Sequence, residues 1–210
     1  MKIAFLLDKH NNWIEPFVKK YICLKQIGKI FYNSADVRDN DLVFILGYTK
    51  LVDDNFLNTN KLNLVIHESD LPTGKGFSPI QWQILDGKNE ITFSLFEAQK
   101  EIDSGPIYLQ RIVKFGGYEL FDEIRNIQGV ETINLIDDFL KMYPNVVSRK
   151  QFGKETIYPR RTKRDDRLDI NKTIMEQFNH FRIADNDKYP LWFEINGHKY
   201  NLKISRIYNE

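Results

Sequence analysis

Two side chains of this sequence, His67 and Asp103, stand at positions where they could move a proton. Residues 64–66 form a short apolar run that predicts a buried strand, and His67 follows at its carboxyl end, where open α/β sheets bind ligands. Asp103 lies in the turn Ile-Asp-Ser-Gly-Pro at residues 102–106, between two predicted strands. An imidazole has an ordinary pKa of about 6.5, so it can act as base or acid at neutral pH, and a carboxylate can stabilise its cation. His67 and Asp103 are therefore the candidates for acid–base chemistry.

A glycine-containing loop follows the candidate histidine and leads into a helix. Gly74 and Gly76 loosen the chain around Lys75, and Ser78 followed by a proline is the N-cap and N1 pair that predicts a helix over 79–85. A loop that opens a helix in this way can receive a ligand. The loop is not a phosphate-binding P-loop, because GxxxxGK[ST] requires an earlier Gly and a Ser or Thr directly after the Lys.

These segments together carry a resemblance to a known family. The phrase HxSxLP after a strand, the loop, an apolar helix closed by a Gly, and a strand followed by DSGPI resemble the folate-dependent formyltransferases. That family includes glycinamide ribonucleotide, methionyl-tRNA and nucleotide-sugar N-formyltransferases. The resemblance implies 10-formyltetrahydrofolate as donor, His67 and Asp103 as the catalytic residues, and a pterin bordered by the backbone over 97–102. The cofactor-binding residues implied in this way are Glu97, Ala98, Ile102 and Gly76.

The family's third catalytic group, an Asn two residues before the His, is replaced here by Val65. Asn63 shares that face of the strand by alternation, but lies roughly 6–7 Å further along it. Formyl transfer to an amine passes through a tetrahedral adduct with an oxyanion, which needs hydrogen-bond donors. Without the Asn, the donor would be protonated His67, a backbone N–H group or water. Losing one such donor typically costs on the order of 2.7–4 kcal/mol, so an active enzyme needs a replacement.

Three further segments are candidates for binding the acceptor. Between the first predicted strand and helix, two adjacent Asn and a Trp suit a nucleotide or sugar, although one Asn could instead cap the helix. The loop after residue 46 resembles a substrate loop of sugar formyltransferases, and the Arg-rich segment 156–169 could reach a diphosphate. Both could equally be solvated loops, the second with internally paired charges. The substrate-binding candidates are Asn11, Asn12, Trp13, Tyr48, Lys50, Lys75, Tyr158, Arg160 and Arg161.

The elements that must position these residues alternate strand and helix, which predicts an α/β, Rossmann-like fold with a mostly parallel sheet. Strands are expected over 2–7, 29–32, 42–46, 64–66, 91–96 and 107–113, and helices over 13–22, 53–57, 79–85 and 119–141, the last interrupted at most near Gly129. A helix over 171–181 and a hairpin around Asn196-Gly197, with strands 191–195 and 200–204, follow.

We predict a catalytic core over residues 1–150 and a C-terminal extension over 151–210 that packs on the core. No separate C-terminal domain is expected of the kind with which methionyl-tRNA formyltransferases hold their RNA, which favours a small acceptor.

Composition limits the class of protein. The 210 residues are 42% hydrophobic with a net charge of +1, which argues against a dedicated nucleic-acid or membrane-surface binder. No apolar run approaches the roughly 18 residues of a membrane span, so we expect a soluble cytoplasmic protein. Cys23 is the single cysteine, so no disulfide and no CxxC metal pair can form, and no metal is expected. Cys23 and Trp82 are both expected to be buried.

The resemblance implies a formyltransferase acting on the amine of a nucleotide-activated amino sugar. The phrases HESDLP, SPIQWQILDGKNEI and LFEA look most like short formyltransferases of bacterial pseudaminic-acid-type pathways, which use a UDP-linked 4-amino sugar. Two alternatives stay open: a formyltransferase for another small amine, such as glycinamide ribonucleotide, and a non-catalytic nucleotide-sugar or folate binder. Neither a nucleic acid nor a membrane is expected as a partner.

Overall fold

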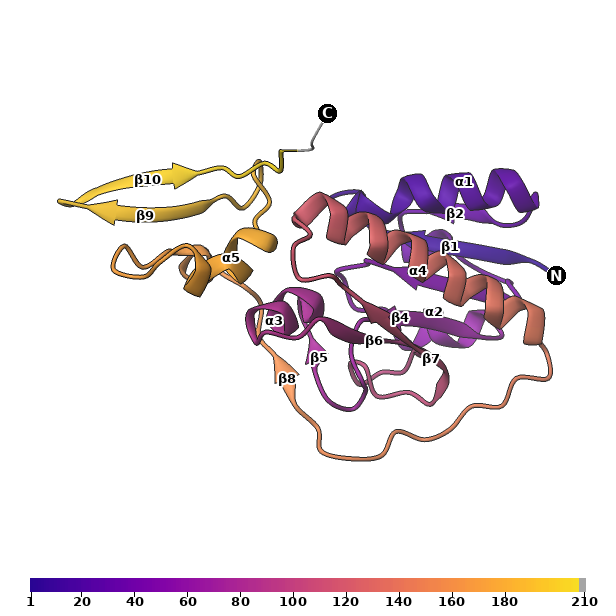
Figure 1. Cartoon of the computed structure of the whole chain (residues 1–210). Helices are drawn as coiled ribbons and strands as arrows, with labels where there is room; N and C mark the ends of the chain where they lie inside the picture. The colour runs from indigo at the N-terminus through magenta and orange to yellow at the C-terminus, as the bar shows by residue number, and fades with distance from the viewer. Residues whose placement is uncertain (208–210) are drawn as a thin grey trace.

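The centre of the computed structural model, which describes residues 1–207, is a six-stranded sheet in the order β2-β1-β3-β4-β6-β7 (Figure 1). Its strands are β1 (Ile3–Leu7), β2 (Lys29–Phe31), β3 (Leu42–Leu46), β4 (Asn63–His67), β6 (Glu90–Glu97) and β7 (Ile107–Lys114). The first four pair in parallel, whereas β6 runs antiparallel to both β4 and β7. The predicted α/β fold with a mostly parallel sheet is confirmed. Because β7 is thereby parallel to β4, strands β1, β3, β4 and β7 all end at one edge of the sheet.

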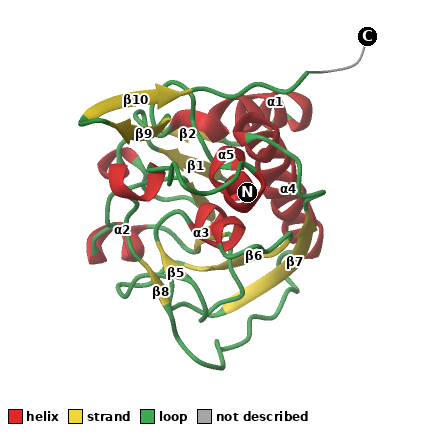
Figure 2. Cartoon of the chain, turned by 60° about the vertical axis from the view of Figure 1, so that its left-hand side comes forward, coloured by secondary structure: helices red, strands yellow, loops and turns green. Residues whose placement is uncertain are grey.

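Helices cover both faces of the sheet because the strand residues alternate between two apolar layers. Phe5 and Phe44 belong to the larger core, which α1 (Glu15–Lys25) and α4 (Phe121–Met142) cover. Leu6 faces the smaller core with Phe56 of α2 (Asp54–Thr59). Figure 2 shows α1 and α4 on one side of the sheet and α2 on the other.

Helix α4 passes Gly129 without a break over its 22 residues. A Cβ atom at Gly129 would lie 2.5 Å from the ring of Phe17, so the glycine allows α1 and α4 to cross at close range. Gly129 therefore serves helix packing and not helix termination.

The structure corrects three local expectations. Helix α3 (Pro79–Leu85) starts as predicted, but Ser78 has a φ of +52°, a left-handed conformation unlike the extended one typical of an N-cap, and its side chain makes no capping hydrogen bond. Cys23 is exposed on α1, so the prediction that it is buried is wrong. Trp82 is half-buried and stacks on Tyr158 at the surface instead of entering the core, because its indole N–H bonds a backbone carbonyl there.

The C-terminal part differs more from the prediction. The helix expected over 171–181 is wrong: a 3-10 turn, Met175–Gln177, leads into the short α5 (Phe178–Arg182). Thr173 and Glu176 exchange hydrogen bonds through their side chains and backbone N–H groups, and this capping box delays the start of the helix. The hairpin of β9 (Leu191–Ile195) and β10 (His198–Leu202) is confirmed around its Asn-Gly turn, although its second strand begins two residues earlier than predicted.

Figure 1 shows the hairpin extending away from the sheet, while α5 lies beside α3 and the start of α4. A small apolar cluster that includes Leu168, Phe181 and Leu191 holds the hairpin to α5. Residues 143–156 run below the sheet to a two-stranded parallel pair that the sequence did not predict, β5 (Lys75–Gly76) with β8 (Ile157–Tyr158). The domain boundary at residue 150 stays a prediction, and residues 208–210 of the extension lie outside the described residues. Within residues 1–207, no helix is both long and apolar enough to cross a membrane.

Candidate active site

The side chains of His67 and Asp103 meet, although His67 ends β4 and Asp103 follows β6. These two strands are antiparallel neighbours, so their carboxyl ends lie at opposite edges of the sheet. Nδ1 of His67 lies 3.7 Å from Oδ2 of Asp103, with 9% and 12% of the two side chains exposed. Nε2 of His67 lies 2.7 Å from the carbonyl oxygen of Gly74. Because a carbonyl oxygen only accepts, Nε2 carries a proton and donates it, which leaves Nδ1 as the basic nitrogen of the neutral ring. The basic atom therefore faces the carboxylate.

Asp103 is held in place by the backbone of its surroundings. Its Oδ2 accepts a hydrogen bond of 2.9 Å from the Gly76 N–H, and its own carbonyl oxygen accepts one of 2.8 Å from Nε2 of Gln151. The φ of Asp103 is +50°, a left-handed conformation that Asp tolerates better than most residues. At Gly105 a Cβ would lie 1.7 Å from the Glu97 carbonyl oxygen, so only glycine closes the turn here. The turn thus positions the carboxylate independently of His67.

The loop after His67 is fixed by the unpredicted pairing of β5 with β8. The N–H of Gly74 donates to Oγ1 of Thr156 (2.8 Å), and the N–H of Lys75 donates to the carbonyl oxygen of Thr156 (3.0 Å). Gly74 has a φ of +77°, and a Cβ there would lie 2.7 Å from the Tyr158 ring. These contacts hold the Gly74 carbonyl where it receives the imidazole.

Val65 stands two residues before His67, where the resemblance implies an Asn. Val65 packs against Leu71 and Phe96. The Nδ2 of Asn63 donates to the Leu57 carbonyl oxygen (3.0 Å), so this side chain ties β4 to α2. Sequence reasoning passed over Ser69, the Ser of HxSxLP, whose buried hydroxyl lacks a hydrogen-bond partner among the described residues. Ser69 contacts the Gly74 segment, since its Cβ would lie 3.1 Å from a Cβ on Gly74.

The two loops predicted to bind the acceptor lie side by side and are joined through Asp8, which is 4% exposed. Its carboxylate accepts hydrogen bonds from the Thr49 hydroxyl and from the His10 N–H (2.8 Å), and these bonds lower the pKa of Asp8 below its ordinary value despite burial. Asn11 stands at the N-cap position of the 3-10 turn Asn12–Ile14, but its side chain makes no capping hydrogen bond, and its Nδ2 donates instead to the Gly47 carbonyl oxygen (2.9 Å). The capping alternative for Asn11 is therefore wrong, because its amide joins the two loops.

The other acceptor candidates near the N-terminal loops differ in exposure. Asn12 and Lys50 are exposed, whereas Trp13 and Tyr48 are half-buried. Trp13 lies under the guanidinium of Arg125, with 4.8 Å between the ring centroid and Cζ. Their predicted substrate-binding roles stay predictions.

The candidates from the Arg-rich segment fall into two groups. Arg161 is ion-paired with the buried Asp166, and burial lowers the pKa of Arg161 and raises that of Asp166. This pairing favours the alternative in which the charges of the segment satisfy one another. Arg160, in contrast, is exposed and stacks over the ring of Phe77 at 4.5 Å.

Tyr158 and Lys75 lie on the small two-stranded sheet beside the candidate catalytic pair. The ring of Tyr158 stacks on that of Trp82 with 6.5 Å between centroids, and burial raises the pKa of Tyr158. Lys75 is 8% exposed, and its Nζ pairs with Glu155 Oε2 at 2.7 Å. The ammonium of Lys75 is therefore already engaged.

The residues predicted to border the folate surround the Asp103 turn. The Oε2 of Glu97 accepts a hydrogen bond of 3.3 Å from the Tyr108 hydroxyl, and the N–H of Ala98 donates to the Asn63 carbonyl oxygen (2.8 Å). Ile102 is 51% exposed directly beside Asp103. An uncovered apolar side chain next to the candidate carboxylate of Asp103 fits a flat ring system such as a pterin.

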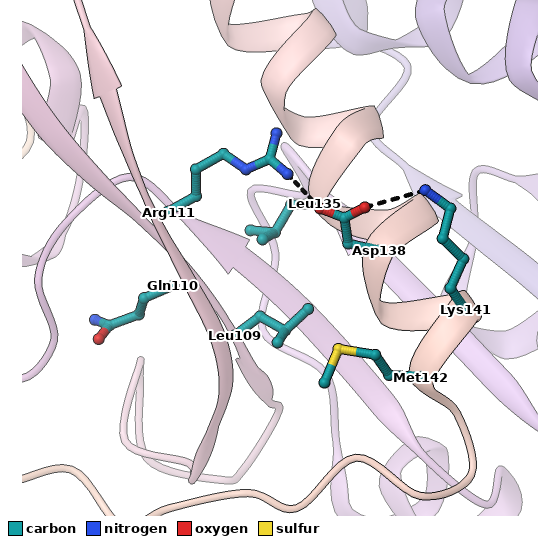
Figure 3. A pocket seen from close by; sticks show the side chains of 7 residues that line it. All are labelled: Leu109, Gln110, Arg111, Leu135, Asp138, Lys141 and Met142. Carbon is teal, nitrogen blue, oxygen red and sulfur yellow. Dashed lines mark hydrogen bonds and ion pairs between the residues drawn. The ribbon is translucent and has the colours of Figure 1, made fainter.

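A separate surface hollow of about 310 Å³ lies between β7 and α4 (Figure 3). Figure 3 shows Arg111 and Lys141 turned toward Asp138, and Lys141 Nζ lies 3.2 Å from its Oδ1. Neither His67 nor Asp103 lines this hollow, so it is not part of the candidate active site. Within residues 1–207 no three His, Cys, Asp or Glu side chains are grouped to hold a metal ion.

Comparison with known proteins gives matches to a family model and to curated relatives. Residues 25–119 match the family model described as formyl transferase. The methionyl-tRNA formyltransferase of Thermosipho melanesiensis is 33% identical over 146 residues, which cover 69% of this chain and 47% of that protein. The chain thus spans about half the length of the curated relatives it matches.

Three solved structures share the fold. A methionyl-tRNA formyltransferase from Clostridium thermocellum has a TM-score of 0.83 at 17% identity, covering 99% of this chain and 94% of its own. A sugar N-formyltransferase from Shewanella sp. FDAARGOS_354 has a TM-score of 0.73 at 14% identity, covering 100% of both chains. HypX from Aquifex aeolicus in complex with tetrahydrofolic acid has a TM-score of 0.76 at 15% identity, covering 97% of this chain and 37% of its own. At these identities the likeness concerns the fold.

Proposed function

We propose that the chain transfers a formyl group from 10-formyltetrahydrofolate to the amino group of a nucleotide-linked amino sugar, because its residues 25–119 match the family model described as formyl transferase. The observation that carries the proposal is the approach of His67 Nδ1 to Asp103 Oδ2, 3.7 Å apart. These two residues come from the segments that resemble the family's catalytic His and Asp, and the fold brings them together although they lie 36 positions apart in the sequence.

His67 performs the proton transfer in this proposal. Its Nδ1 takes the proton that the acceptor amine loses as the amine nitrogen bonds to the formyl carbon, while Gly74 holds Nε2–H and keeps the ring in place. Asp103 stabilises the resulting imidazolium across a short gap. The same proton then passes from Nδ1 to the folate nitrogen as its bond to the formyl carbon breaks, which restores the neutral ring and leaves atoms and charge balanced.

Oxyanion stabilisation needs a donor other than the family Asn. The N–H groups of Gly74 and Gly76 already donate to Thr156 and Asp103, so the nearby backbone has little to offer. The Ser69 hydroxyl is buried beside Gly74 and has no partner among the described residues, which makes it the donor that we propose in place of the amide.

The folate site in this proposal lies along the Asp103 turn. The exposed Ile102 and the neighbouring Ala98 offer apolar contact, and Gly76 approaches closely because it has no side chain. The donor supplies the formyl group. HypX from Aquifex aeolicus, which shares this fold, has been solved with tetrahydrofolic acid, and this supports a folate as the donor here.

A sugar acceptor is supported by the Shewanella sugar N-formyltransferase, which this chain matches over the full length of both. The two loops joined by Asp8 also present Asn12 and Lys50 to solvent at the sheet edge where His67 emerges. A UDP-linked 4-amino-4,6-dideoxy sugar is the acceptor we propose. The second candidate is methionyl-tRNA, because the curated relatives at the sequence level are methionyl-tRNA formyltransferases.

Mass spectrometry of acceptors incubated with the protein and 10-formyltetrahydrofolate tests the proposal. The panel contains UDP- and dTDP-linked 4-amino sugars, glycinamide ribonucleotide and methionyl-tRNA, with His67→Asn as the inactive control. A gain of one formyl group on a sugar nucleotide supports the proposal and identifies the base. Formylation of methionyl-tRNA or glycinamide ribonucleotide instead would show that this molecule, and not a nucleotide sugar, is the acceptor. Nucleotide-sugar binding without product across the whole panel would indicate a binder that has lost catalysis.

A further inference from the structure

Arg125, in the second turn of α4, has hydrogen-bond donors that the described residues leave largely unused. Its Nη1 donates to Oε1 of Gln128 at 2.6 Å, and its Nε is buried without a partner. Within residues 1–207, no carboxylate lies within ion-pair distance of this guanidinium. The arginines at 111, 161 and 182, in contrast, each pair with at least one carboxylate.

Two aromatic rings lie against the Arg125 guanidinium. Its Cζ lies 4.8 Å from the ring centroid of Trp13 and 5.1 Å from that of Phe121. Burial lowers the pKa of Arg125, an effect that the more distant charges of Glu68 and Asp185 oppose. Taking a cation out of water without a contacting anion costs free energy that two cation–π contacts offset only in part. Holding the Arg125 guanidinium in this place therefore costs the chain folding free energy.

The position of Arg125 in the fold connects it with the candidate active site. Helix α4 follows β7, which ends at the same sheet edge as β4, so its first turns lie where His67 emerges. Gln128 bridges Arg125 to Glu68, the residue after His67, because its Nε2 donates to the Glu68 carboxylate. Trp13 belongs to the loop that Asn11 and Asp8 join to the loop after β3. The cation thus lies behind the loops predicted to bind the acceptor.

We propose that Arg125 binds a phosphate group of the acceptor, with Trp13 and Phe121 fixing the plane of the guanidinium and Gln128 its rotation. A guanidinium donates two parallel hydrogen bonds to phosphate oxygens, and a pre-oriented one loses little entropy on binding. This inference rests on the proposed function. It adds Arg125 as a specificity-determining residue and the diphosphate of the acceptor as the group that Arg125 recognises. Sequence reasoning missed Arg125 because it sits among the apolar positions of a long amphipathic helix.

The test is the variant Arg125→Gln, measured for binding and for stability. The probes are UDP and inorganic pyrophosphate, with affinities from isothermal titration calorimetry and melting temperatures with and without probe. We expect the affinity for both probes to fall at least tenfold, because a paired phosphate contact is lost, while the affinity for 10-formyltetrahydrofolate stays unchanged. The melting temperature without probe should stay the same or rise, since a half-buried charge with no contacting carboxylate is removed. Arg38→Gln is the matched control, because Arg38 is exposed in the segment that leads into the amino end of β3, far from the edge where β4 ends, and its Nε donates to the Ala35 carbonyl oxygen.

Three results would overturn the inference: no binding of either probe by the natural chain, unchanged affinity in Arg125→Gln, or a lower melting temperature of the unliganded variant with probe affinity retained. The variant Arg125→Lys keeps the charge and the fold but loses the two-pronged contact, so its affinity should lie between those of the natural chain and Arg125→Gln. Turnover separates this inference from the proposed function. If the Arg125→Gln variant keeps normal probe affinity and still forms product, only the role of Arg125 is contradicted. If probe binding depends on Arg125 but the natural chain forms no product, only the proposed formyl transfer is contradicted.

Discussion

Two acid–base pairs in this molecule are buried to a similar degree but are built in opposite ways. In the first, His67 and Asp103 stand 3.7 Å apart, and each side chain makes its short hydrogen bond to backbone. In the second, Arg182 and Glu119 are 1% and 9% exposed, and Nη2 of the arginine lies 3.4 Å from the carboxylate. The first pair leaves Nδ1 of its imidazole available to a substrate. In the second pair, both charged groups are bound by other groups of the chain.

The surroundings of the second pair explain its role. Glu119 also accepts hydrogen bonds from the N–H groups of Gly116 (2.5 Å) and Gly117 (3.0 Å), and Nη1 of Arg182 donates to Oδ1 of Asn89 (2.8 Å). Burial alone would raise the pKa of Glu119, but these N–H groups and the charge of Arg182 lower it below its ordinary value. Arg182 ends α5 and Glu119 precedes α4, so the pair fastens the C-terminal part to the sheet. Substitutions in the two pairs should therefore separate activity from stability.

The largest effect is expected at the first pair. His67→Asn removes the proton acceptor, and Asp103→Asn removes the charge that stabilises the imidazolium, so turnover should fall by a factor of roughly 10²–10⁴ in each variant. Neither change removes a packing contact of the core, and the melting temperature should stay within a few degrees. Formyl transfer to the acceptor identified by mass spectrometry gives the rate, and circular dichroism gives the melting temperature. Near-normal turnover in either variant would remove that residue from the mechanism.

The second pair should show the reverse pattern. Arg182→Met leaves Glu119 buried without its cation, which should lower the free energy of unfolding by about 3–5 kcal/mol. Turnover per folded molecule should be retained, because neither residue contacts His67 or Asp103. The double variant Glu119→Gln with Arg182→Met should recover part of the loss, since no unpaired charge remains. Urea denaturation measures the free energy of unfolding of the natural chain, of Arg182→Met and of the double variant. An Arg182→Met variant as stable as the natural chain would contradict the role of the pair.

A smaller effect is expected at Val65, which stands where the resemblance to formyltransferases implies an Asn. Val65→Asn adds an amide two residues before His67, and turnover should rise about tenfold, less than the 10²–10³ that a full oxyanion donor supplies, if Ser69 is the donor proposed above. Stability should fall by about 1–3 kcal/mol, since the amide enters an apolar contact with Leu71 and Phe96. Val65→Ala is the control that removes the packing without adding a donor. If the two variants have equal turnover, the amide has no catalytic role in this site.

The sheet and the buried arginines differ in how far the sequence predicts them. Alternating apolar strands and an Asn-Gly turn have local signatures, so the sheet and the C-terminal hairpin were predicted correctly. The pairing of β5 with β8 has no such signature, because two-residue strands some 80 residues apart show no periodicity. The same limit applies to Arg125 and Arg182: a long polar side chain on a helix resembles a solvated one in sequence. Its burial depends on tertiary partners, which for Arg125 are Trp13 and Phe121.

The smallest effect is expected at a third acid–base group, which is neither deeply buried nor near His67. Hydrogen bonds from Lys141, Lys25 and Tyr21 lower the pKa of Asp137 to about 2, and this cluster joins α4 to α1. A depressed folded-state pKa stabilises the fold above the unfolded value of about 3.9, and this contribution is lost as the pH falls from about 4 to about 2. Because the two lysines are exposed and screened, Asp137→Asn should cost only about 1 kcal/mol at pH 7. Urea denaturation of both proteins between pH 7 and pH 2 should show this difference shrinking toward zero below pH 4. A difference that is independent of pH would mean that packing, and not charge, links Asp137 to α1.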